Sequence, residues 1–207
     1  MTKEGKRDPL NLIICGVGGQ GNVLASRIIA SAGIEEGLFV TIGETYGASQ
    51  RGGSVMSHVR FSEVMQYGPL IPEGSAHIIL GFEPTETLRV IADFGNPDID
   101  VIVNPRPYYS IDVLAGRSEY PDISEVLDMI RELSSSLEIV EATELAKEAG
   151  KALTQSVVMI GALAGSRLLP ISEDAFRSAI TSAFLNKDPD LNQRAFDLGF
   201  GTLNRTL

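Results

Sequence analysis

A glycine-rich turn is the first feature of the sequence whose residue types and spacing could do chemistry. Gly16, Gly18 and Gly21 follow an apolar run of strand length and open a segment with helical apolar spacing. Glycines at this spacing permit a tight turn, close approach of a phosphate to the main chain and close strand–helix packing. The additional Gly19 and the side-chain amide of Gln20 are candidate ligand contacts. The turn predicts a site for a nucleotide-like ligand, although the same glycines could serve only strand–helix packing.

Two charged residues follow the second predicted strand. Glu44 stands where a dinucleotide-binding enzyme places the acid that binds the ribose hydroxyls. Arg51, beside Gly52 and Gly53 in a glycine-rich stretch from 43 to 54 that we interpret as a loop, could hold a phosphate or carboxylate through two hydrogen bonds. It could equally form a structural ion pair with Glu44, so both interpretations stay open.

Polar residues also follow two later apolar runs. Glu83 and Asn104 come directly after predicted strands. Because ligands bind outside the carboxyl ends of parallel strands, we expect these residues, the glycine turn and Glu44 to meet at one edge of a sheet. Glu83 precedes Pro84 and could instead stabilise only the start of a helix.

Other residues with reactive side chains have simpler interpretations. His58 and His77 lack the spacing of a metal site, so we predict structural roles for both. Cys15 ends a buried strand, where an inert thiol is expected. Gly161 and Gly165, four residues apart in an apolar helix, predict close packing of helices or subunits.

The elements that must position these residues alternate between strands and helices. Short apolar runs predict strands at 12–15, 38–42, 55–61, 77–80, 101–103 and 137–140; helical spacing predicts helices at 23–32, 84–94 and 123–133, and helices from 143 onward that break near Pro170 and Pro189. The first helix is long enough for a right-handed crossover between two parallel strands, and 55–61 alternates like a partly exposed strand. We predict an α/β fold: a doubly wound, Rossmann-like three-layer sandwich with a mostly parallel sheet and a helical C-terminal third. A disordered lead (1–10) would precede a single domain (11–207).

Composition narrows the classes of partner. Lys and Arg number 17 and Asp and Glu 27, so the net charge of −10 argues against nucleic-acid binding. One cysteine can form neither an internal disulfide nor an iron–sulfur cluster of its own, and we expect a cytoplasmic protein. The longest apolar region, 157–169, contains Arg167 and is shorter than the roughly 20 residues of a membrane span, so we expect no membrane partner.

Several motifs together resemble one enzyme family. They are GVGGQG after the first strand, residues 44–47 leading to 50–53, residues 83–89 and residues 192–199. From about 12 to 200 the chain is similar to the gamma domain of 2-oxoacid:ferredoxin oxidoreductases. It departs from the family pattern at Gln155 and Ser156, where relatives often carry an Asn before an apolar helix, and at His77, where an acid often begins the strand.

The resemblance implies a subunit of an enzyme complex. Such complexes decarboxylate a 2-oxoacid with thiamine diphosphate and magnesium, pass electrons through iron–sulfur clusters to ferredoxin, and transfer the acyl group to coenzyme A. The chain lacks the GDG motif that holds magnesium and thiamine diphosphate. The resemblance therefore implies that a larger partner subunit carries thiamine diphosphate and the clusters, that ferredoxin is reached through the complex, and that the isolated chain is inactive.

Within such a complex, the resemblance assigns this chain a binding role. The glycine turn and Arg51 would hold the phosphate or ADP part of coenzyme A, and no catalytic or metal-ligating residue is assigned. An arylpyruvate such as indolepyruvate is the expected substrate. Two alternatives stay open: a free-standing NAD-dependent dehydrogenase, suggested by the glycine turn and Glu44, and a non-catalytic assembly module whose glycine turn binds nothing.

Overall fold

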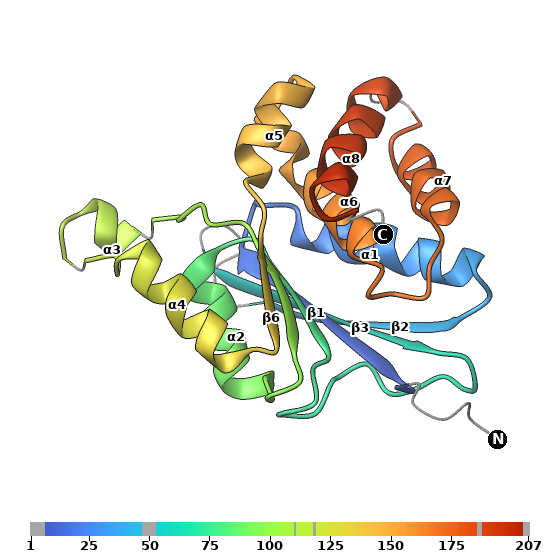
Figure 1. The fold of residues 1–207 in the computed structure, drawn as a ribbon, viewed down its shortest axis with the longest axis horizontal. Coiled ribbons are helices and arrows are strands. Elements are labelled where there is room, and N and C mark those ends of the chain that lie inside the picture. The colour runs from blue at the N-terminus through green and yellow to red at the C-terminus, as the bar shows by residue number, and fades with distance from the viewer. Residues whose placement is uncertain (1–6, 47–52, 110, 118, 186–187, 205–207) are drawn as a thin grey trace.

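Six strands form one sheet with helices on both faces (Figure 1). The computed structural model describes residues 7–46, 53–109, 111–117, 119–185 and 188–204. The strands lie in the order β2-β3-β1-β4-β5-β6. Their bounds are β1 Leu10–Val17, β2 Phe39–Tyr46, β3 Ser54–Ser62, β4 Ile78–Gly81, β5 Asp100–Val103 and β6 Ser136–Ile139. The predicted strands are therefore present: β1, β2, β3 and β5 are longer than predicted, and β4 and β6 have the predicted length but are shifted by one residue.

The sheet is mostly parallel, as predicted, but its first two strands are not neighbours. Strand β3 lies between β1 and β2 and runs antiparallel to both. The predicted loop from 43 to 54 is wrong at its start, because 43–46 belong to β2 and pair with 55–58 of β3. Strand β3 is also more buried than predicted, since Ser57, His58 and Val59 are almost inaccessible. The alternation of apolar and polar residues along a sequence does not show whether the strand lies at the edge of a sheet or between two other strands.

The helices form two unequal layers. One face carries α1 Asn22–Glu35, α5 Ala142–Ala149, α6 Gln155–Ser166, α7 Glu173–Ala183 and α8 Pro189–Leu203, and the other carries α2 Pro84–Phe94 and α4 Ile123–Leu133 (Figure 1). Two short helices, α3 Ile111–Leu114 and η1 Ala152–Thr154, lie in connections. The predicted helices at 84–94 and 123–133 and the breaks near Pro170 and Pro189 are confirmed. The three-layer α/β architecture is thus the predicted one.

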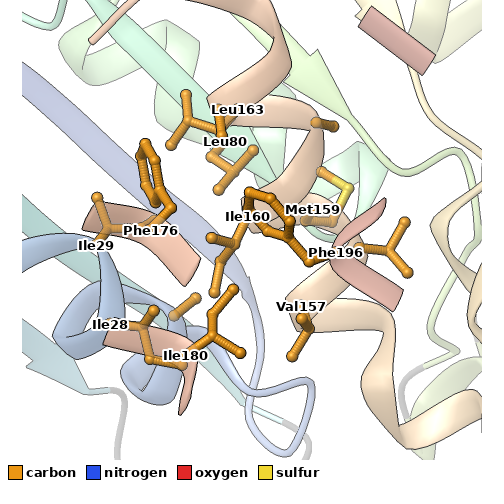
Figure 2. Close-up of a cluster of buried hydrophobic side chains, with 14 of the residues drawn as sticks. Ile28, Ile29, Leu80, Val157, Met159, Ile160, Leu163, Phe176, Ile180 and Phe196 are labelled. Atoms are coloured by element: carbon orange, nitrogen blue, oxygen red, sulfur yellow. The ribbon is translucent and has the colours of Figure 1, made fainter. Parts of the chain in front are cut away.

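The larger core lies beneath the C-terminal helices. Figure 2 shows Ile28 and Ile29 of α1, Ile160 of α6, Phe176 of α7 and Leu80 of β4 in one cluster of apolar side chains. All five side chains are buried. Burying a side chain of this size stabilises a fold by about 1.5–3 kcal/mol before entropy is counted. The core therefore joins the helical third firmly to the sheet.

Small residues let two helices of this layer approach closely. A Cβ on Gly161 of α6 would lie 2.9 Å from the backbone nitrogen of Phe200, and one on Gly199 of α8 would lie 2.8 Å from the carbonyl carbon of Val158. Gly165 meets the α8 backbone in the same way. The predicted close packing is confirmed, and it takes place between α6 and α8.

The N-terminal boundary differs from the predicted one. Strand β1 begins at Leu10, and the carboxylate of Asp8 accepts a hydrogen bond from the backbone N–H of Glu63 at 3.4 Å. The last residue of the predicted disordered lead (1–10) therefore belongs to the sheet. The single domain remains a prediction. Within the described part of the chain, no helix combines the length and apolar character that a membrane crossing demands.

Candidate functional site

The glycine turn lies at the carboxyl edge of the sheet, between the end of β1 and the start of α1. Gly19 and Gly21 have φ angles of +108° and +91°, which favour glycine. A Cβ on Gly16 would lie 2.8 Å from the Cβ of Phe82, so this position also needs glycine. Gly21 is the N-cap of α1 and offers no side-chain acceptor to the first N–H groups of the helix. These N–H groups and the helix dipole make the turn suitable for an anion.

Gln20 lies in this turn, but its carboxamide serves the main chain. Its Oε1 accepts a hydrogen bond from the N–H of Val17 at 2.7 Å, and its Nε2 donates to the carbonyl of Phe82 at 3.1 Å. The residue is 7% exposed. The geometry gives Gln20 the role of fixing the turn against β4, and its expected contact with a ligand has no geometric support.

Asn104 continues a polar network along the same edge. Its Nδ2 donates to the Phe82 carbonyl at 3.5 Å and to Thr143 Oγ1 at 3.3 Å. The Thr143 hydroxyl in turn donates to Gln155 Oε1 at 3.1 Å. The carbonyl of Phe82 thus joins Gln20 to Asn104, and the network links the glycine turn to the helices α5 and α6. The predicted meeting of the turn and Asn104 at one edge is confirmed.

Glu83 has the simpler of its two predicted roles. It caps α2, with Oε2 accepting hydrogen bonds from the N–H of Glu86 at 2.9 Å and from Thr85 Oγ1 at 2.7 Å. Its Oε1 accepts a short hydrogen bond from the hydroxyl of Tyr120 and a longer one, 3.4 Å, from the N–H of Tyr108. Burial and the bond to Glu83 raise the pKa of Tyr120. Glu83 is therefore a buried anchor for the segment that follows β5.

Glu44 lies apart from the turn. It belongs to the outer strand β2, and its Oε1 is 4.0 Å from Nε of the exposed Arg27. Because β3 separates β2 from β1, two strand spacings of about 4.8 Å each separate their axes. In a dinucleotide-binding fold the acid follows a strand adjacent to the first one. Glu44 therefore lies in the same sheet as the turn but two strands to its side, and its part in ligand binding stays a prediction.

Of the glycine-rich stretch that contains Arg51, the last two residues, 53 and 54, are described next to the turn. Arg51 and Gly52 lie outside the described residues. Gly53 is described, and its carbonyl accepts a hydrogen bond from the N–H of Gly18 at 2.8 Å. Gly53 is thus held against the glycine turn by the main chain, and the ion pair of Arg51 with Glu44 stays a prediction.

Two polar residues at the turn were not among the predicted site residues. A Cβ on Gly21 would lie 3.0 Å from Oγ of Ser156, the second residue of α6. Ser156 is 3% exposed. Asn22 begins α1, and both ends of its buried carboxamide lack a hydrogen-bond partner among the described residues. The departure from the family pattern at Gln155 and Ser156 was the feature of the sequence that could have indicated that the start of α6 lies at this site.

The remaining titratable candidates are structural. His58 Nδ1 accepts a hydrogen bond from the N–H of Ile71, and His77 Nδ1 accepts one from the N–H of Asn11. Burial lowers the pKa of both histidines. Burial raises the pKa of the Cys15 thiol, as expected for an inert cysteine.

Comparisons with known proteins agree with this architecture. The family model described as pyruvate ferredoxin/flavodoxin oxidoreductase matches residues 11–202. The chain is 40% identical over 191 residues to the indolepyruvate oxidoreductase subunit IorB of Archaeoglobus fulgidus, covering 92% of this chain and 94% of that protein.

Solved structures show the same fold. The gamma subunit of a keto/oxoacid ferredoxin oxidoreductase from Geobacter sulfurreducens matches with a TM-score of 0.68 and 21% identity, covering 95% of this chain and 99% of that one. A 2-oxoglutarate:ferredoxin oxidoreductase from Magnetococcus marinus, with 2-oxoglutarate, coenzyme A and succinyl-CoA bound, matches with a TM-score of 0.74 and 22% identity, covering 98% of this chain and 32% of that one. From the family match and the 40% identity, the chain belongs to the pyruvate ferredoxin/flavodoxin oxidoreductase family.

Proposed function

We propose that this chain is the non-thiamine-binding subunit of a 2-oxoacid:ferredoxin oxidoreductase that converts an arylpyruvate such as indolepyruvate to an acyl-CoA. Its contribution is to bind the phosphate part of coenzyme A at the glycine turn. The observation that carries the proposal is the uncapped start of α1, tied through Gly18 to Gly53, in a chain that matches the family over 11–202. The name of the Archaeoglobus relative supports indolepyruvate, and the coenzyme A in the Magnetococcus structure supports the acyl acceptor.

The chemistry of the turn suits a pyrophosphate. Backbone N–H groups at a helix start donate to phosphate oxygens, and the helix dipole favours negative charge there. The Arg51 side chain would add a charge-assisted hydrogen bond from the neighbouring stretch. Buried residues such as Gln20 and Asn104 fix the turn, so its N–H groups are positioned before the ligand arrives.

The redox and decarboxylation steps belong to a partner in this proposal. The chain has one cysteine, Cys15, which is buried and carries a thiol with a raised pKa, so it does not fit as a cluster ligand. A larger subunit would supply thiamine diphosphate, magnesium and the iron–sulfur clusters that reduce ferredoxin. The isolated chain would consequently be inactive.

Co-purification tests the assembly. The chain, tagged and recovered from native extract, is expected to bring with it an equal amount of a larger, brown, cluster-containing subunit. The complex should oxidise arylpyruvates in the presence of coenzyme A, and the separated small chain should not. Recovery of a monodisperse free chain without that partner, or oxoacid turnover by the chain alone, would contradict the proposal.

Kinetics of the complex test the binding role. Arg51→Ala should raise the KM for coenzyme A roughly tenfold, since a hydrogen bond to a charged group contributes about 1.5–3 kcal/mol. The KM for the oxoacid should change little. Arg131→Ala is the matched control, because Arg131 pairs with Asp128 on the exposed side of α4. An unchanged KM for coenzyme A in Arg51→Ala would favour the non-catalytic assembly module.

A further inference from the structure

A polar pocket of about 460 Å³ lies at the amino edge of the sheet, far from the glycine turn. It is lined by Pro9 and Asn11 around the start of β1, and by His77 and Asp98, which precede β4 and β5. Figure 1 shows β1 starting near the end marked N and running to the opposite edge of the sheet. The eight residues of β1 separate the pocket from the glycine turn by about 25 Å, at about 3.3 Å per residue. The pocket is therefore a separate site, with a volume in the range of about 300–1,000 Å³ that small-molecule sites occupy.

Hydrogen bonds fix the floor of this pocket. The backbone N–H of Asn11 donates to His77 Nδ1 at 2.9 Å, and Asn11 Oδ1 accepts from Nε of Arg60 at 3.1 Å. Asn11 Nδ2 donates to the carbonyl of Ser75 at 2.8 Å, and Asn96 Nδ2 donates to two further carbonyls of the same loop. The pocket is thus formed before a ligand arrives, which lowers the entropic cost of binding.

Two donors line the pocket without a partner in the described part of the chain. Because His77 Nδ1 accepts from Asn11, the neutral imidazole carries its proton on Nε2, and no described residue accepts from that atom. Burial, and then the charge of Arg7, lower the pKa of His77, which keeps the ring neutral at pH 7. The guanidinium of Arg7 is exposed and forms no ion pair with a described residue. A guanidinium and an N–H group together suit a carboxylate.

Two carboxylates line the same pocket. Asp98 is exposed and forms no ion pair with a described residue. Asp8 accepts one hydrogen bond of 3.4 Å at Oδ2, from the N–H of Glu63, and its buried Oδ1 has no partner among the described residues. These carboxylates repel a phosphate or a dicarboxylate and attract an ammonium group. Charged groups of both signs that are not paired with one another suit a ligand that itself carries both charges.

We propose that this pocket binds a free α-amino acid, with the carboxylate at Arg7 and His77 and the ammonium group at Asp98. Pro9 and Pro72 offer apolar surface to the side chain of the amino acid. The inference goes beyond the proposed function, because binding here needs neither the partner subunit nor coenzyme A.

Tryptophan fluorescence tests the proposal on the full chain, because the chain contains no tryptophan. L-Tryptophan serves as the probe, since the pocket recognises groups that all α-amino acids share, and its emission anisotropy gives the dissociation constant. Tryptamine, which lacks the carboxylate, and indole-3-propionate, which lacks the ammonium group, should each bind about tenfold more weakly. Equal binding of all three would identify a site for the indole ring, and displacement of L-tryptophan by inorganic phosphate would identify an anion site. Either result, or no binding of L-tryptophan at millimolar concentration, would overturn the proposal.

Two single variants assign the ends of the ligand. Arg7→Gln should weaken the binding of L-tryptophan and indole-3-propionate about tenfold and leave tryptamine unchanged. Asp98→Asn should weaken L-tryptophan and tryptamine by a similar factor and leave indole-3-propionate unchanged. Both residues are exposed, so neither substitution disturbs the core. Arg131→Gln, at an arginine that pairs with Asp128 on α4, is the matched control and should change none of the three.

The pattern across the three ligands decides the outcome. Opposite effects of the two variants on the singly charged ligands would support the proposed orientation. Binding of L-tryptophan that neither variant weakens would place the amino acid elsewhere on the chain and overturn the proposal. The proposed function would stand in that case, because its own test is the KM for coenzyme A in Arg51→Ala.

Discussion

Gln20 connects two buried backbone groups at the glycine turn, and only one of them, the carbonyl of Phe82, has a second partner, in Asn104. Its carboxamide satisfies the N–H of Val17 and the carbonyl of Phe82. Gln20→Ala should lower the free energy of unfolding by about 1–3 kcal/mol, the cost of leaving buried polar groups unsatisfied. Urea denaturation measures the change, with the exposed Gln66→Ala as control. Unchanged stability together with weaker coenzyme A binding would instead make Gln20 a ligand contact.

Tyr120 gives the buried Glu83 a pH-dependent partner. Its hydroxyl donates to the Glu83 carboxylate, and burial together with this bond raises its pKa above the ordinary value of about 10. A raised pKa in the folded state means that the stabilisation is complete below about pH 10 and is lost as the pH rises toward the raised value. The stability advantage of the wild type over Tyr120→Phe should therefore shrink above about pH 10.

Unfolding free energies of both proteins at several alkaline pH values measure this effect. Spectrophotometric titration adds a direct readout: the folded wild type and the folded Tyr120→Phe should ionise the same amount of tyrosine near pH 10, since the Tyr120 hydroxyl keeps its proton there. An advantage that stays constant across this pH range would show that the Tyr120 hydroxyl ionises normally in the folded protein.

At the scale of elements, the crossing of α6 and α8 depends on glycine. Gly199→Ala should lower the free energy of unfolding by about 1–3 kcal/mol, because its Cβ would overlap the backbone at Val158. Gly201→Ala in the same helix is the matched control: its Cβ would meet no atom within 4 Å, and Ala in a helix is favoured over Gly by about 0.5–1 kcal/mol. Thermal denaturation should therefore give shifts of opposite sign. Equal shifts would mean that the crossing adapts to the extra methyl group.

The elements themselves were largely predictable from the sequence, because apolar spacing and capping residues act locally. Pro84 marks the start of α2 in the sequence as well as in the structure, and the apolar spacing at 123–133 gave the bounds of α4. The place of β3 was not predictable, since the pairing of Cys15 with Met56 joins segments far apart in the chain. The hydrogen bond of the Gln20 side chain to Phe82 and the closeness of Gly21 to Ser156 also depend on long-range packing. The sequence therefore predicted where the site lies but not which side chains meet there.

At the scale of the whole molecule, the sheet order bears on two functions that share a glycine turn. The inserted β3 places Glu44 on the outer strand, about 10 Å sideways from β1 when measured by strand spacing. The network that meets the turn instead joins the Phe82 carbonyl and Asn104, which directly follow β4 and β5, to polar side chains of α5 and α6. The polar network of the turn therefore extends toward the helical C-terminal third, and Glu44 lies outside this network.

This arrangement makes a prediction for the isolated chain. NADH at millimolar concentration should not bind it, and Glu44→Ala should leave its ligand binding unchanged, because the acid is displaced from the turn and faces Arg27. Isothermal titration of NADH and of coenzyme A into the wild type and the variant measures both effects. If the wild type bound NADH tightly and Glu44→Ala abolished that binding, the free-standing dehydrogenase would be the better interpretation. The nucleotide would then have to reach from the turn after β1 to Glu44 on β2, across the strand between them.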